Sequence, residues 1–467
     1  MNKGHTIRRG SKREKGAVLL LTTLAILFLI VPCVGLAIDG GVAFAVKARL
    51  QTAVDGAALA ASRSLSRGLS LDQQRSSAEL TAQKFFHANM HQAWSNLTNT
   101  SAILTFPAAP PKTTIIRVDA TVDAPTYFMR IFGVNSLHLN SSGSANRRDV
   151  NIVIVLDRSG SIANLGACDE LRSAAKSFVE TFVDGRDRLS LVTFGTSYRV
   201  DFPAAYNFRT AGTNVVNMIE SIRCVGGTNS AAAYWLAWDQ LRILNEQNTL
   251  NVILFFTDGQ PNTLHMPSLQ LKGTSPCTNR ADKNGVITPA GTAVWGIFQP
   301  IEPTSPPARS EDWVLVSGSS NCAYANRFSD VPDDIVSLAR AGTANEVDAF
   351  GNSLTGYKTV RRDAEGRIRI NDWETVTNAA TNAIDNAAAR VRSISATMGL
   401  DVYTYCIALG GAPSPAENQL MRRLANTSDS PTFDSSKPEG LFVMANNSGQ
   451  LEQAFSQLAS DILRISQ

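Results

Sequence analysis

Three short segments of the chain carry oxygen-bearing side chains that together could bind a metal ion. The first is Asp157-Arg-Ser-Gly-Ser161, a D-x-S-x-S pattern, the second is Gly226-Gly-Thr-Asn229, and the third is Thr257-Asp-Gly259. Two carboxylates and three hydroxyls are the candidate ligands, supplied by Asp157, Ser159, Ser161, Thr228 and Asp258. Hard oxygen donors of this kind favour Mg²⁺, Ca²⁺ or Mn²⁺ over Zn²⁺.

Two of these segments directly follow apolar runs, at 150–156 and 251–256, and similar runs cover 189–194 and 402–409. A continuous apolar run is typical of a parallel strand that is buried on both faces. Helical stretches separate or follow the runs, at about 167–183, 213–223, 230–245, 372–397, 415–425 and 449–465. The alternation predicts an α/β fold with a doubly wound, mostly parallel sheet. In such a sheet, ligands bind beyond the carboxyl ends of the strands, where Asp157 and Asp258 are expected.

In order and placement, the three segments resemble the metal-ion-dependent adhesion site of von Willebrand factor type A domains. The resemblance covers about 149–261 and 371–467. It implies that the hydroxyls of Ser159, Ser161 and Thr228 contact the ion, whereas Asp157 and Asp258 act largely through water. It also implies an open coordination position that an acidic side chain of a partner protein can fill.

Signals for catalysis are weak by comparison. The S-x-x-K pattern of Ser173 to Lys176 lies in a predicted helix and lacks the companion motifs of an acyl-transfer enzyme. His87 and His91 are four residues apart on a predicted helix, but no glutamate follows His87 and no third ligand is evident. The sequence contains neither a Walker loop nor GxGxxG. We therefore expect a binding module rather than an enzyme.

Residues 262–370 form an insertion where type A domains usually have a short helix and turn. The insertion is rich in Pro, Ser, Thr, Asn and Gly, with strand-like pieces at 293–298 and 313–316 and a hairpin pattern at 357–370. Because it follows Asp258, we expect it at the metal-binding face. It could recognise a partner, or it could be a tolerated elaboration of the surface.

The N-terminal region combines a basic tail with an uncharged apolar run. Residues 1–15 hold six basic side chains against one acidic one, and residues 17–38 carry no charge. As a helix, this run spans about 33 Å, close to the thickness of the bilayer core. A cleavable secretory signal is the alternative, but its apolar part is usually shorter and no A-x-A site follows here. We expect a single-pass anchor of the cytoplasmic membrane, with the tail inside and the main domain periplasmic or at the cell surface.

Outside the tail, the charges are nearly balanced. The remaining 452 residues hold 37 basic and 39 acidic side chains, so the body has no basic excess. This balance disfavours nucleic acid as a partner.

An alanine-rich, proline-free sequence continues the apolar run to about Leu65, which predicts one long helix with a kink at Gly40-Gly41 as an option. A capping box at 70–73 predicts a second helix to about Trp94, and alternation at 114–122 predicts strands. Residues 16–62 resemble the N-terminal region of TadE/TadG-like proteins of the Tad (tight adherence) pilus-assembly system. The resemblance is carried by a glycine before the apolar run, by Ala-Ile-Asp at 37–39 and by ARLQTAVDGAALAA at 48–61.

This resemblance implies a role beside pilus or secretion components. One feature departs from the pattern of peptidase-processed pilins, because residues 17–21 lack the glutamate that those members carry. We therefore expect no cleavage at Gly16.

Five of the six cysteines follow the apolar run, on the side of the membrane where disulfides persist. Cys168 and Cys224 each lie close in sequence to a metal-binding segment, and we predict that they pair. Cys277 and Cys322 share the insertion, and we predict a second disulfide between them. Cys406 lies in the middle of a predicted strand and is expected to be a buried thiol.

The sequence thus predicts four parts: a cytoplasmic tail at 1–16, a transmembrane helix at 17–38, a Tad-like helical stalk with a small α+β region at 39–147, and a type A domain at 148–467. We expect a membrane-anchored component of Tad/Flp-type pilus assembly or adhesion that binds acidic partner proteins through Mg²⁺, Ca²⁺ or Mn²⁺. The alternative is an accessory type A subunit of an ATPase or metal-chelatase-like machine. Export of the domain disfavours the alternative, because those ATPases are cytoplasmic.

Overall fold

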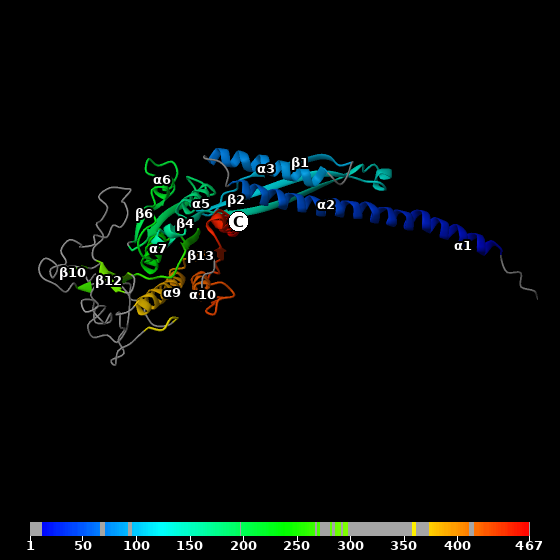
Figure 1. Cartoon of the computed structure of the whole chain (residues 1–467). Helices are drawn as coiled ribbons and strands as arrows, with labels where there is room; N and C mark the ends of the chain where they lie inside the picture. The colour runs from blue at the N-terminus through cyan, green and yellow to red at the C-terminus, as the bar shows by residue number, and fades with distance from the viewer. Residues whose placement is uncertain are drawn as a thin grey trace, which may run out of the picture. The chain divides into compact units, whose positions relative to one another are not determined.

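The computed structural model describes residues 12–65, 71–91, 96–196, 198–266, 269–270, 281–282, 285–290, 293–297, 357–360, 373–410 and 415–466. The chain divides into two compact units (Figure 1). The first ends at Arg147, and the second runs from Arg148 onward with two short earlier segments, 68–71 and 110–113. Each unit has a hydrophobic core of its own.

A long helical segment opens the first unit. It consists of α1 (Lys12–Ala25), a π-helical turn η1 (Ile26–Ile30) and α2 (Val31–Ser64). The π turn precedes Pro32, which has no backbone N–H to donate and therefore favours such a local irregularity. α2 continues through Gly40-Gly41, and Val18–Ser64 is long and apolar enough to cross a membrane. Only 6% of its most apolar window is buried within the protein, so these side chains are free to face lipid.

The rest of the first unit packs two helices against a small sheet. The sheet has the order β1-β2-β3, formed by β1 (Thr98–Thr105), β2 (Thr113–Pro125) and β3 (Ser136–Arg148). Alternate residues of β2 are buried, which confirms the strand predicted at 114–122. They pack against α3 (Leu71–His91) and against fully buried small residues of α2, namely Ala53, Ala57, Ala58 and Ala61. The small side chains allow the α2 backbone to approach its neighbours closely.

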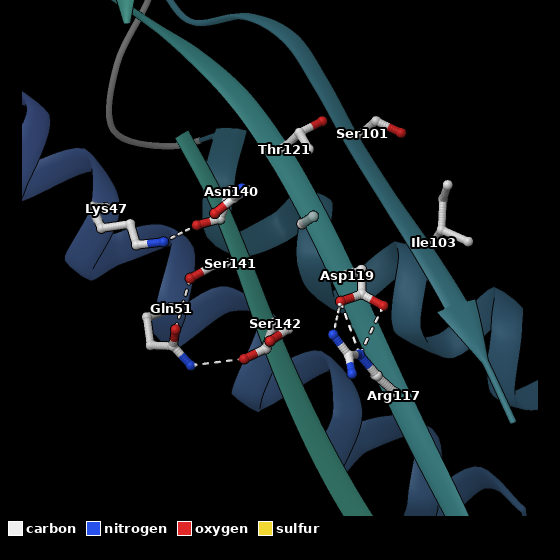
Figure 2. A pocket seen from close by; sticks show the side chains of 11 residues that line it. Lys47, Gln51, Ser101, Ile103, Arg117, Asp119, Thr121, Asn140, Ser141 and Ser142 are labelled. Carbon is white, nitrogen blue, oxygen red and sulfur yellow. Dashed lines mark hydrogen bonds and ion pairs between the residues drawn. The ribbon is translucent and has the colours of Figure 1, made fainter. Parts of the chain in front are cut away.

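The edge strand β3 is covered by α2 (Figure 2). Lys47 Nζ donates to the carbonyl of Asn140, and Gln51 Nε2 donates to the carbonyl of Ser142 at 3.1 Å. Gly143 permits this approach, because a Cβ there would lie 2.8 Å from the backbone nitrogen of Asp55. An uncovered edge strand would offer its carbonyls to other chains. These helix side chains therefore occupy acceptors that could otherwise template strand pairing.

The second unit is built around a six-stranded sheet of order β14-β13-β7-β4-β5-β6. Its strands are β4 (Val150–Asp157), β5 (Arg188–Phe194), β6 (Tyr198–Ala205), β7 (Leu250–Thr257), β13 (Val402–Leu409) and β14 (Phe442–Ala445). Neighbouring strands are parallel except for β6, which is antiparallel to β5. The four strands predicted from apolar runs are all present.

Helices cover both faces of this sheet (Figure 1). Ile152 and Ile154 of β4 face one core, whereas Val153 and Val155 face the other. The first core includes α5 (Cys168–Glu180), α6 (Val215–Glu220) and α11 (Leu451–Ile465). The second includes α7 (Ser230–Leu244), α9 (Trp373–Thr397) and α10 (Pro415–Ala425). The doubly wound α/β architecture predicted from the sequence is confirmed.

Part of the insertion is described. It contains β8 (Leu264–Met266), β9 (Leu269–Gln270), β10 (Ala281–Asp282), β11 (Gly285–Ala290) and β12 (Ala293–Ile297). β12 confirms the strand-like piece predicted near 293–298. The piece at 313–316 and most of the predicted hairpin lie outside the described residues. Tyr357 belongs to the described part of the predicted hairpin, and its hydroxyl donates a hydrogen bond to Gln419 of α10 at 3.0 Å.

Candidate metal centre

The two candidate carboxylates lie on neighbouring strands in the middle of the sheet. Asp157 is the last residue of β4, and Asp258 directly follows the last residue of β7. β4 and β7 are parallel and adjacent, so their carboxyl ends meet at the same edge. The sheet therefore brings together two residues that are 101 positions apart in the sequence.

Two serine hydroxyls converge on Asp258. The Oγ of Ser161 donates to Asp258 Oδ1 at 2.9 Å, and the Oγ of Ser159 lies 3.3 Å from the same oxygen. The two hydroxyls are 2.9 Å apart. Both belong to the start of a short helix, α4 (Gly160–Asn164), for which Ser159 is the N-cap residue. The turn after β4 thus directs both hydroxyls to the carboxylate that follows β7.

Asp157 is fully buried and is held by two other groups. Its Oδ1 accepts a hydrogen bond from the backbone N–H of Ser159 at 2.8 Å. Its Oδ2 accepts one from the hydroxyl of Thr257 at 2.6 Å. The sequence identified Thr257 only as the end of a strand. Its hydrogen bond to Asp157 was not predicted. These two hydrogen bonds fix the orientation of the carboxylate.

Thr228 reaches the same edge from the turn before α7. Gly160 N donates to the carbonyl of Gly226 at 2.9 Å, which joins the turn after β4 to the loop that carries Thr228. Thr228 is itself buried, and its backbone N–H donates to Asn262 Oδ1 at 2.8 Å. Asn262 N donates back to the Thr228 carbonyl at 3.2 Å. Sequence reasoning placed Asn262 only as the first residue of the insertion.

The charge of the site favours a cation. Burial raises the pKa of Asp157 to about 7, and repulsion from Asp258 acts in the same direction. Hydrogen bonds from Thr257 and Ser159 oppose this shift. A divalent ion near both carboxylates would stabilise their ionised forms. The described residues include no group of three or more His, Cys, Asp or Glu arranged to hold a metal, so the candidate donors here are two carboxylates together with hydroxyls. A donor set of this composition fits Mg²⁺, Ca²⁺ or Mn²⁺.

Comparison with known families agrees with this geometry. Residues 152–260 match the model of the von Willebrand factor type A domain. This chain carries a type A domain. Residues 16–64 match the model described as putative Flp pilus-assembly TadE/G-like, which agrees with the second resemblance seen in the sequence. The match to the type A domain ends before β13 and β14, which extend the same sheet after the insertion.

Solved structures similar to the chain include three pilus proteins. The PilB minor pilin from Streptococcus sanguinis is 15% identical, over 79% of this chain and 80% of that one, with a TM-score of 0.36. The pilus adhesin SpaC from Lactobacillus rhamnosus GG is 14% identical, over 78% and 36%, with a TM-score of 0.38. The vWF domain of the type V pili tip protein Mfa5 from Porphyromonas gingivalis is 14% identical, over 69% and 98%, with a TM-score of 0.35. The comparison with curated proteins gives no significant match.

A disulfide lies beside the candidate site of the type A domain. It joins Cys168, the first residue of α5, to Cys224, with a Cα–Cα distance of 6.1 Å. This is the first pairing predicted from the sequence, and it ties the loop before Gly226 to the helix after α4. The second predicted pair, Cys277 and Cys322, lies outside the described residues. Cys406 is a buried free cysteine on β13, as expected, and burial raises the pKa of its thiol.

Proposed function

We propose that this protein is a membrane-anchored component of Tad/Flp-type pilus assembly or adhesion that binds partner proteins through a metal ion at its type A domain. The observation that carries the proposal is the cluster of two carboxylates and two serine hydroxyls at one edge of the sheet, with Thr228 in the adjoining loop. The TadE/G-like segment at residues 16–64 supports the pilus context. The role proposed is binding, not catalysis.

The roles of the individual side chains follow from their positions. Ser159, Ser161 and Thr228 would contact the ion directly, and Asp258 would shift from hydrogen bonding the serines to balancing its charge. Asp157 would remain in place because Thr257 and Ser159 N–H already orient it. A bound divalent ion supplies a Lewis-acidic position that a carboxylate of a partner can fill. No side chain is assigned as a general base.

Partner capture should depend on the ion. We expect the full chain, purified in detergent and immobilised, to retain pilus or secretion components with Mg²⁺, to lose them with a chelator, and to regain them when Mg²⁺ is restored. Excess acetate should compete, because it offers the same carboxylate. Binding that is indifferent to chelator would contradict the metal-bridge mechanism and point to the insertion as the contact surface.

The apolar helix is proposed to anchor the protein in the cytoplasmic membrane, with residues 1–16 in the cytoplasm and the type A domain outside. Protease added to intact spheroplasts should therefore digest the type A domain and spare an epitope in the tail. An isolated protein whose N-terminus begins at Ala17 would contradict the retained cytoplasmic tail.

A further inference from the structure

The loop between β2 and β3 exposes three large apolar side chains. It contains a short 3-10 helix, η2 (Met129–Phe132), that ends at Gly133 in the left-handed conformation. Tyr127, Ile131 and Phe132 are 55%, 74% and 69% exposed. A cluster of exposed apolar side chains on one loop indicates a surface that is covered in the functional protein.

The loop is held on α2 by one buried carboxylate. Asp39 is 2% exposed, and its two oxygens accept hydrogen bonds from three successive backbone N–H groups. The distances are 2.8 Å from Tyr127, 2.9 Å from Phe128 and 2.7 Å from Met129. N–H groups at the start of a helical turn have no partner within the turn, and an acidic side chain there satisfies them.

A second contact, one turn earlier on α2, fixes the same loop. The ring of Phe128 lies directly on Gly35, where a Cβ would be only 2.1 Å from the ring. Any other residue at this position would displace the ring, so the absence of a side chain is what allows the contact. Phe128 in turn packs against Phe132, with ring centroids 5.8 Å apart. The apolar face of the loop is therefore positioned by α2 itself.

The position of these contacts along α2 determines what surrounds the loop. Gly35 lies within the uncharged run 17–38, and Asp39 is the first charged residue after it. Gly35 is three residues inside the end of the run, or about 4.5 Å along the helix axis. If the run spans the bilayer, the loop lies at the boundary between the headgroups and the acyl chains. The β1-β2-β3 sheet runs alongside α2, and Figure 1 shows the β2–β3 loop at the end of the sheet that is nearer to α1.

We propose that the β2–β3 loop is a second membrane contact, in which Tyr127, Ile131 and Phe132 insert into the outer-leaflet interface beside α2. This inference rests on the proposed anchoring through residues 17–38. Aromatic side chains favour the membrane interface, and aliphatic ones favour the acyl region below it. The exposed Arg130 can reach lipid phosphates from the same loop. The sheet of the first unit would then be fixed against the leaflet rather than tethered by a single helix.

Photocrosslinking to lipid tests this contact in the full chain. The protein would be reconstituted into vesicles of phosphatidylethanolamine and phosphatidylglycerol that contain alkyne-tagged phosphatidylethanolamine. Benzoylphenylalanine would replace Ile131 in one variant, Leu29 of the apolar helix in a second, and Ile103 of β1 in a third. Leu29 and Ile103 are 65% and 62% exposed, so all three probes are accessible. Lipid adducts are expected at Ile131 and Leu29, with only background at Ile103.

The three positions separate failure of the loop proposal from failure of the anchor. Adducts at Leu29 without adducts at Ile131, or adducts at Ile131 only to another protein chain, would overturn the loop contact and leave the anchor intact. Absence of adducts at Leu29 would overturn the anchor, and the loop contact with it. Asp39→Ala should weaken the lipid adduct at Ile131 and preserve that at Leu29, because it removes the acceptor of three backbone N–H groups of the loop while the contact of Phe128 with Gly35 remains. Unchanged crosslinking at Ile131 in Asp39→Ala would refute the role of the carboxylate.

Discussion

Asp258→Ala should abolish Mg²⁺ binding while leaving the type A domain folded. Substitution of a residue that only orients a metal ligand typically lowers metal affinity by about 10–100-fold. Loss of a carboxylate beside the ion should therefore lower the affinity for Mg²⁺ by at least about 100-fold. The fold should survive because Asp258 is only partly buried and lies just beyond β7. Its removal also relieves the repulsion that acts on Asp157. Titration calorimetry and the Mg²⁺-induced shift in melting temperature measure the two effects.

Asp401→Ala is the matched control. Asp401 is exposed and directly precedes β13, so it lies at the opposite edge of the same parallel sheet. This variant should bind Mg²⁺ like the unaltered protein and capture partners equally well. If Asp258→Ala retained its Mg²⁺-induced shift in melting temperature, the ion would have to bind elsewhere. If Asp258→Ala did not bind Mg²⁺ but still captured partners, the ion would not mediate partner binding.

Without divalent ions, the type A domain should become less stable as pH rises from about 4 to about 7. Burial and the neighbouring Asp258 raise the pKa of Asp157 to about 7, whereas an unfolded aspartate titrates near 3.8. Between these values the folded protein holds a proton that the unfolded chain has lost. The free energy of unfolding therefore falls with rising pH, by at most about 1.4 kcal/mol per pH unit for this one group, and levels off above pH 7.

Asp157→Asn isolates this contribution, because the amide keeps the shape of the carboxylate and does not titrate. Chemical unfolding of both proteins in chelator, across that pH range, should show the Asp157-dependent fall only in the unaltered chain. Saturating Mg²⁺ should reverse the trend, since the ion favours the ionised carboxylate. Identical pH dependence in the two proteins would mean that Asp157 is ionised throughout.

The central strands could be predicted because each is buried on both faces and therefore appears as an unbroken apolar run. β6 and β14 could not, for a physical reason. Both are edge strands with partly exposed residues, and β6 contains Pro203, which an edge strand tolerates because it need not donate on both sides. Their sequences therefore lack the apolar continuity that identified the others.

The candidate site was predictable to the extent that strand ends determine it. Parallel strands bring Asp157 and Asp258 together, and the motif order named the other candidate donors, of which the two serine hydroxyls lie at Asp258. The contributions of Thr257 and Asn262 could not be read from the sequence, because they depend on how a hydroxyl and an amide turn within loops. The contact of Asp39 with the β2–β3 loop was equally hidden, since it joins residues 88–90 positions apart through backbone N–H groups.

Two hydrogen bonds between Thr228 and Asn262 connect the loop that carries Thr228 to the start of the insertion. A ligand that shifts the chain at Asn262 must also shift the backbone that presents the Thr228 hydroxyl. Thermodynamic linkage is reciprocal. If the ion changes the affinity of the insertion for its ligand by some factor, that ligand changes the affinity for the ion by the same factor. If the proposed ion binds here, a partner protein bound at the insertion would thus raise or lower the affinity for that ion, and the concentration of free Mg²⁺ would change the affinity for that partner.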